Sequence, residues 1–177
     1  MIQRLRRLLG CERGYTLIEL LQVTVILSVV LGAVTTLFVR ASIAEVDMNR
    51  RFQAQQEARL AVDRMRREIH CASLVSPTGT SSSITVTLPS GCPTSAGGAT
   101  TVVYDTQLVS TGRYSLRRDG VRVADYVTAA NVFTYTAQST SGLGKLNVTM
   151  PVNLTPTDAS KEWRLVADIV LRNTTRS

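Results

Sequence analysis

The sequence predicts an α+β fold in which one long N-terminal helix packs, by its second half, on an antiparallel β-sheet. Three observations lead to this prediction. An uncharged apolar run covers residues 20–39, and an apolar stripe with helical spacing follows it. From Ser76 onward, apolar and polar residues alternate between turn residues, as they do in half-buried strands. A chain of 177 residues is long enough for one such domain and a membrane anchor, but too short for two domains of typical size.

The apolar run from Leu20 to Val39 has the length that an α-helix needs to cross the hydrocarbon core of a membrane. Four arginines and one glutamate precede it in residues 1–14, and this cationic excess indicates the cytoplasmic side. The run could belong to a secretory signal cut after Ala44, to a plain signal anchor, or to a third kind of segment. The apolar core of a secretory signal is usually shorter than this run. Neither a secretory signal nor a plain anchor explains Glu19 at the start of the run, where a carboxylate costs free energy in the membrane.

The second half of the helix is predicted by an apolar stripe that recurs with helical spacing. The stripe comprises Ala58, Ala61, Val62, Met65, Ile69 and Ala72. Charged residues occupy the other faces, and we expect Glu57, Asp63 and Glu68 to form a solvated surface with the neighbouring arginines. Because no proline occurs before Pro77, the helix is expected to run continuously over residues 15–72.

Short strands are expected in the rest of the chain, separated by turns. The expected strand segments are SITVTL, TTVVYD, YSL, VRV, NVFTYT, KLNVTM and EWRLVADIVLRN, and the segment SGCPTSAGGA is expected to be a loop. Asp119-Gly120 is a two-residue hairpin signal, because both residue types accept a positive φ. In the last strand, alternate residues from Trp163 to Leu171 are expected to share one face.

The stretch GYTLIE, which follows a short basic leader, resembles the processing site of type IV prepilins and type II secretion pseudopilins. In that family a membrane-embedded peptidase cuts after the glycine on the cytoplasmic side, and the new amino terminus is methylated. The resemblance covers about residues 10–40. It implies cleavage after Gly14, N-methylation of Tyr15 (where phenylalanine is commoner), and a role in filament assembly for Glu19.

Glu19 lies four residues after Tyr15, on the same helical face one turn later. In hydrocarbon, the carboxylate and the methylated amine of Tyr15 would offset each other's cost, within one subunit or between neighbours. A carboxylate in the first turn also complements the helix dipole. In the family, the amine of an incoming subunit is thought to meet the glutamate of a subunit already in the filament. Glu19 is therefore expected to set the register of assembly, the alternative being an acidic residue that is tolerated near the membrane interface.

The resemblance divides the chain into a cleaved leader (1–14), a transmembrane helix half (15–39), an amphipathic helix half (40–73) and an extracytoplasmic sheet domain (74–177). It implies a structural subunit in the bacterial inner membrane, and afterwards in a cell-surface pilus or a periplasmic pseudopilus. The alternative function is an extracytoplasmic binding domain on a plain signal anchor. The expected partners are other pilin or pseudopilin subunits, the prepilin peptidase and methyltransferase, the inner-membrane assembly platform and membrane lipid.

The length of the sheet region, the helix end EARLAVDRMRREIHCAS and the terminal IVLRN resemble the J-type minor pseudopilins and related minor pilins. These similarities favour a minor subunit over a major one. They leave open whether the system is a type IV pilus, a type II secretion pseudopilus or a competence pilus.

The sequence offers few groups for catalysis, and we predict no enzyme activity, no cofactor and no metal site. The only histidine, His70, is expected at the surface or the helix end, and it points about 100° away from the adjacent Cys71 on a helix. No cysteine and histidine spacing suits a metal, and no glycine-rich loop suits a phosphate. The net charge is +7, but arginines and aromatic residues do not interleave, so a nucleic-acid partner is not predicted.

Two of the three cysteines, Cys71 and Cys92, follow the apolar run, whereas Cys11 precedes it. An even number of cysteines outside the cytoplasm suits a disulfide in an oxidising compartment. A bond between Cys71 and Cys92 would join the end of the helix to the loop after the first expected strand. Two free thiols are the alternative.

Overall fold

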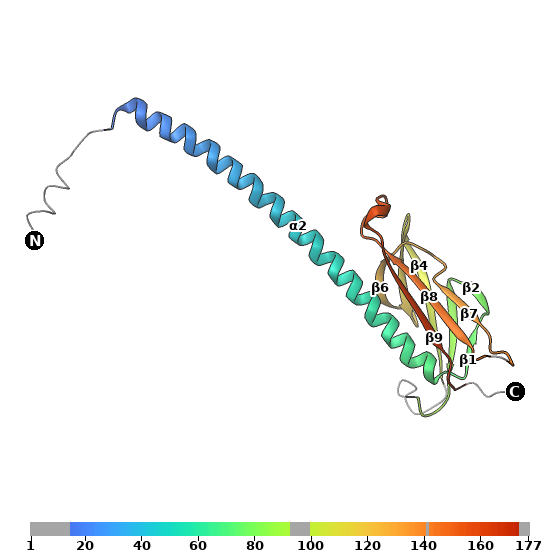
Figure 1. Ribbon diagram of the computed structural model, residues 1–177. Coiled ribbons are helices and arrows are strands. Elements are labelled where there is room, and N and C mark those ends of the chain that lie inside the picture. The colour runs from blue at the N-terminus through green and yellow to red at the C-terminus, as the bar shows by residue number, and fades with distance from the viewer. Residues whose placement is uncertain (1–14, 93–99, 141, 174–177) are drawn as a thin grey trace, which may run out of the picture. The chain divides into compact units, whose positions relative to one another are not determined.

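The computed structural model describes residues 15–92, 100–140 and 142–173. As the sequence predicted, one long helix, α2 (Leu17–Cys71), is followed by an antiparallel sheet (Figure 1). The chain divides into two compact units, residues 1–47 and 48–177, and α2 contributes to both. The leader, Cys11 and most of the expected loop after Cys92 lie outside the described residues.

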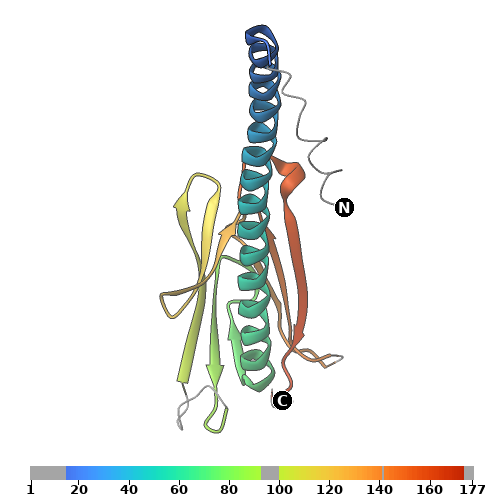
Figure 2. The same ribbon diagram turned by 90° about the vertical axis from the view of Figure 1, so that its left-hand side faces the viewer.

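In the first unit, α2 begins at Leu17, two residues later than expected, and its described side chains are exposed. In the second unit, α2 buries one face. All six residues of the expected stripe are buried, and Ala54 extends the stripe towards the N-terminus. The later part of α2 lies across one face of the sheet (Figure 2). The periodicity therefore identified correctly which face of the helix packs on the sheet.

Within the described residues the sheet has nine strands, and every pair among them is antiparallel. The strands are β1 (Leu74–Ser76), β2 (Gly79–Ser81), β3 (Ser83–Leu88), β4 (Thr100–Ser110), β5 (Arg113–Arg118), β6 (Val121–Val127), β7 (Phe133–Thr136), β8 (Lys145–Val152) and β9 (Trp163–Val170). The sequence predicted β3 to β9. It did not predict β1 and β2, because three-residue strands are too short to show alternation.

The sheet is curled, and its two halves meet where β6 and β8 pair at a single position, Val127 with Val152. One half contains β1, β3, β4, β5 and β6 in this order, and the other contains β9, β8, β7 and β2. Although β2 precedes β3 in the chain, it pairs with β7 in the second half. The chain therefore passes from the first half to the second before β2 and back to the first half after it.

Two local predictions about the strands are confirmed. Asp119 and Gly120 have φ values of +49° and +79°, which the expected two-residue hairpin between β5 and β6 requires. In β9, Ala167 and Ile169 are buried, whereas Val166 and Asp168, on the opposite face, are exposed. Leu171, which follows β9, is buried as well, so the predicted face is the one that joins the core.

The expectation for Glu68 is wrong, because this side chain is fully buried rather than solvated. The hydroxyl of Tyr104 in β4 donates a hydrogen bond to Glu68 Oε2 over 2.6 Å. Arg118 at the end of β5 forms an ion pair with Glu68 Oε1, with its Nη2 at 3.0 Å. Burial, together with the hydrogen bond to this carboxylate, raises the pKa of Tyr104 well above its ordinary value, so the hydroxyl remains a donor.

Glu57 and Asp63 are exposed, as predicted. Glu68 differs from them because it lies at the margin of the buried stripe, one residue before Ile69. Arg64, one turn earlier on the same helix, lies 3.5 Å from Glu68 Oε1, so the expected pairing with a neighbouring arginine is present. Tyr104 and Arg118, however, come from β4 and β5, far along the chain, and helical periodicity carries no information about them. A carboxylate is tolerated in this core because both of its oxygens are bonded to partners.

A second buried carboxylate, Asp125, lies at an irregular point of β6. Arg113 donates to both of its oxygens, over 3.1 and 2.7 Å, and the backbone N–H of Tyr126 donates over 2.7 Å. Burial by itself raises the pKa of Asp125, but the hydrogen bonds from Arg113 and Tyr126 outweigh it, so the net pKa is lowered. The positive φ of Tyr126, +60°, accompanies this arrangement, and the sequence analysis did not foresee it.

Candidate functional site

The candidate processing and assembly site lies at the start of α2, where Thr16 caps the helix. The carbonyl of Thr16 accepts the backbone N–H groups of Glu19 (3.0 Å) and Leu20 (3.2 Å), and its hydroxyl accepts the N–H of Glu19 over 3.4 Å. Thr16 therefore acts as an N-cap that satisfies free donors of the first turn. The sequence analysis missed this residue, although threonine three residues before glutamate is the pattern of a capping box.

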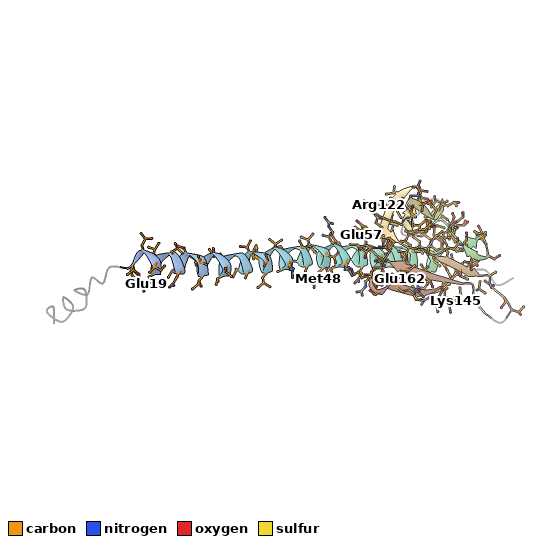
Figure 3. The ribbon with its side chains drawn as sticks, turned by 90° about the horizontal axis from the view of Figure 1, so that it is seen from above. Glu19, Met48, Glu57, Arg122, Lys145 and Glu162 are labelled. Carbon is orange, nitrogen blue, oxygen red and sulfur yellow. A yellow bond between two sulfur atoms is a disulfide. The ribbon has the colours of Figure 1, made fainter. Side chains whose placement is uncertain are left out.

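The structure places the three residues of the predicted site as follows. Gly14 lies outside the described residues. Tyr15 precedes the helix and is 78% exposed, and Glu19 is exposed in the first turn of α2 (Figure 3). Within the described part of the chain, the Glu19 carboxylate has no ion-pair partner. The carboxylate is therefore available to a group from another molecule.

The apolar segment that follows Glu19 satisfies its hydroxyl groups within its own helix. Each of the four hydroxyls donates a hydrogen bond to a carbonyl three or four residues earlier: Thr24 to Leu21, Ser28 to Val25, Thr35 to Leu31 and Thr36 to Ala33, over 2.7–2.9 Å. Such bonds remove the cost of placing a hydroxyl in an apolar medium. By length and composition, α2 is the one helix among the described residues that could span a membrane.

A comparison with protein families finds the prokaryotic N-terminal methylation motif at residues 10–35. No curated protein and no solved structure matches the chain. The motif spans the expected cleavage position and Glu19, and it ends within the apolar segment.

The fold and the motif together fit a class of protein, namely membrane-anchored proteins with a long N-terminal helix followed by an antiparallel sheet. The motif supports a place in the type IV pilin-like family and suggests a pilin or pseudopilin subunit.

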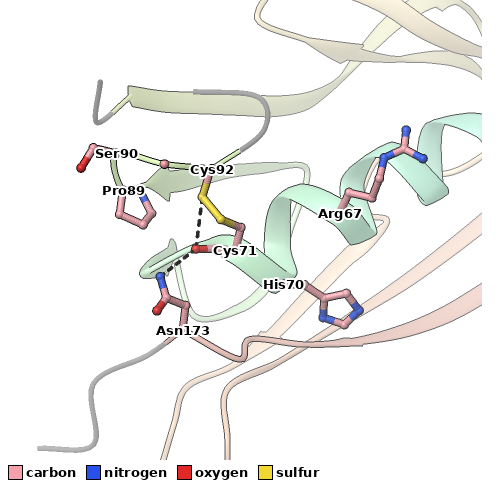
Figure 4. A pocket seen from close by; sticks show the side chains of 8 residues that line it. Arg67, His70, Cys71, Pro89, Ser90, Cys92 and Asn173 are labelled. Atoms are coloured by element: carbon pink, nitrogen blue, oxygen red, sulfur yellow. Dashed lines mark hydrogen bonds between the residues drawn. A yellow bond between two sulfur atoms is a disulfide. The ribbon is translucent and has the colours of Figure 1, made fainter. Parts of the chain in front are cut away.

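At the other end of α2, a disulfide joins Cys71 to Cys92, with their Cα atoms 6.0 Å apart (Figure 4). The side-chain amide of Asn173 donates to the carbonyl of Cys71 over 3.1 Å. His70, half-buried near the helix end, makes a 2.8 Å hydrogen bond through Nδ1 to the carbonyl of Val170. These contacts attach the end of the helix to the loop after β3, to the last residue of β9 and to the segment that follows β9.

These residues also line an open hollow together with Arg67 and Pro89 (Figure 4). The polar groups of His70 and Asn173 are already engaged in the bonds that hold the helix end. Among the described residues, no group of three or more His, Cys, Asp or Glu side chains could hold a metal ion. The arrangement supports a structural role for this end of the molecule.

Reduction of the Cys71–Cys92 disulfide is expected to lower the free energy of unfolding by roughly 3 kcal/mol, because the bond closes a loop of 21 residues in sequence separation. Unfolding of the oxidised and reduced full chain in mild detergent, followed through the fluorescence of Trp163, measures the difference. The double variant Cys71→Ser/Cys92→Ser, which is insensitive to reductant, is the control. Labelling of two thiols per chain beyond Cys11 in the unfolded, unreduced protein would contradict the bond.

Proposed function

We propose that this chain is a minor subunit of a type IV pilus or pseudopilus. It enters the bacterial inner membrane as a precursor with the sheet domain outside the cytoplasm. The prepilin peptidase then removes residues 1–14, and Tyr15 becomes the N-methylated first residue. The mature subunit assembles into a filament, or at its tip, through the membrane half of α2 and the carboxylate of Glu19.

The observation that carries this proposal is the methylation motif at residues 10–35, in register with the start of α2. The proposed cut lies immediately before Tyr15, an exposed residue that precedes the helix. The N-cap, Thr16, is on the mature side of the cut and remains with the helix. Cleavage therefore leaves the helix and its first-turn hydrogen bonds intact, which suits a subunit that keeps this helix for assembly.

Two further features support the proposed topology and status. The Cys71–Cys92 disulfide suits an oxidising compartment, so it favours placing the second unit outside the cytoplasm. The length of the sheet region and the sequence at the end of the helix favour a minor subunit of the J type. The neighbouring genes would identify which filament system the subunit serves.

The processing step is tested by the intact mass of protein extracted from membranes of the native host. We expect a mature chain of residues 15–177 with one methyl group on the amine of Tyr15. A bulky replacement, Gly14→Ile, should leave the leader attached, because peptidases of this type need a small residue before the cut. Gly10→Ile, another glycine of the leader, is the matched control and should be cleaved normally. A chain that starts at Glu45 or retains Met1 without the Gly14 substitution would contradict the proposal.

A further inference from the structure

Gln22 is the uncharged polar residue of the apolar segment that lacks an internal hydrogen-bond partner. Its side chain is exposed, and within the described residues its amide takes part in no hydrogen bond. The four hydroxyls between Leu20 and Val39, in contrast, all donate to carbonyls of their own helix. Every hydroxyl of the segment thus has a hydrogen-bond acceptor within the helix, whereas the amide of Gln22 has no hydrogen-bond partner among the described residues.

The position of Gln22 relates it to the proposed assembly site. Glu19 and Gln22 are three residues apart within α2, so Gln22 shares the helical face of Glu19. It lies about 4.5 Å further along the helix axis than Glu19, on the side of the apolar run. A contact that brings another molecule to the Glu19 carboxylate therefore also brings it near this amide.

The medium restricts what the partner can be. Lipid tails offer neither donors nor acceptors, and an amide without a hydrogen bond is costly in hydrocarbon. Other membrane helices do offer such groups, and amide side chains commonly bond across helix pairs in membranes. The remaining alternative is a solvated headgroup, because side chains on a helix lean towards its N-terminus and Gln22 lies near that end.

We infer that Gln22 is a second contact of the assembly site and that it forms a hydrogen bond with the membrane helix of another subunit in the same filament. This inference rests on the proposed function, since it requires α2 to lie in the membrane among other pilin helices. Glu19 supplies a charge for the neighbour's amine. Gln22 adds a neutral, directional contact one turn deeper, which favours one rotation of the neighbouring helix over the others.

The test uses the full-length chain in its native host, at equal membrane levels, and measures the partner pilins that are isolated with it in mild detergent. Gln22→Leu keeps the size of the side chain and inserts at lower cost, so it is expected to reach the membrane and to mature normally. We expect it to retain roughly 3- to 30-fold less partner pilin than the unchanged chain. The control is Thr24→Val, which removes an internally bonded hydroxyl and should retain the normal amount.

Glu19→Ala, measured in parallel, separates the two possible failures. If Gln22→Leu retains partners as well as the unchanged chain while Glu19→Ala loses them, the inference is overturned and the amide bonds to headgroups or water. The proposed function then stands. If the unchanged chain is not processed after Gly14, the proposed function fails, and the inference fails with it. Loss of partners with Gln22→Leu, normal maturation and an unaffected Thr24→Val would establish the contact.

Discussion

Replacing Glu68 by alanine is expected to lower the free energy of unfolding by about 3–5 kcal/mol, which is the cost of removing one partner from a buried ion pair. The substitution leaves Arg118 largely buried without its carboxylate, and it leaves the hydroxyl of Tyr104 without an acceptor. Asp119 forms a second ion pair with Arg118 and is half exposed, so it compensates part of the loss. We therefore expect a value near 3 kcal/mol.

The measurement is urea unfolding of the full chain in mild detergent, followed through the fluorescence of Trp163. Glu57→Ala is the matched control: it removes an exposed glutamate from the same helix and should change stability by no more than about 0.5 kcal/mol. Tyr104→Phe removes one hydrogen bond to the carboxylate and should cost about 1.5–3 kcal/mol.

The double variant of Glu68→Ala and Tyr104→Phe tests whether the two groups act together. It should be less destabilised than the sum of the single variants, because each single change leaves the other group without its partner. Equal stability of Glu68→Ala and Glu57→Ala would mean that the buried carboxylate does not hold the helix to the sheet.

Replacing Glu19 by alanine is expected to reduce incorporation of the subunit into filaments or tip complexes by roughly tenfold to a hundredfold. This range corresponds to the loss of a charge-assisted hydrogen bond of about 1.5–3 kcal/mol. Processing and membrane insertion should be unaffected, because removing the carboxylate lowers the insertion cost. The first turn also keeps its cap, since the N–H of residue 19 still reaches Thr16.

The amount of variant in purified filaments, at equal membrane levels, measures the effect. Glu45→Ala is the matched control, because Glu45 is exposed on the same helix but lies beyond the apolar run. A subunit at the filament tip has no subunit above it, so its own amine would be unpaired and the defect would fall at the lower end of the range. Undiminished incorporation of Glu19→Ala would mean that the carboxylate is merely tolerated near the interface.

The sequence by itself determined the features that depend on short-range patterns. The long helix followed from the apolar run and the stripe around Met65, because residues three and four apart necessarily share a helical face. Seven strands followed from period-two alternation, and the hairpin at Asp119-Gly120 followed from local backbone preference. The methylation motif was also recognisable, because a peptidase reads a short stretch of chain. The cleavage, methylation and assembly roles of Gly14, Tyr15 and Glu19 stay predictions.

The tertiary structure alone decided the features whose partners are distant in sequence. Tyr104 and Arg118 are 36 and 50 residues from Glu68, and this distance is why a glutamate among arginines was mistaken for a solvated one. Only the folded sheet brings β2 beside β7 and lets β6 meet β8 at Val127. The same holds for the ion pair between Arg113 and Asp125. The physical reason is the same in each case: a buried polar group is stable only when bonded, and only the fold brings the bonding group to it.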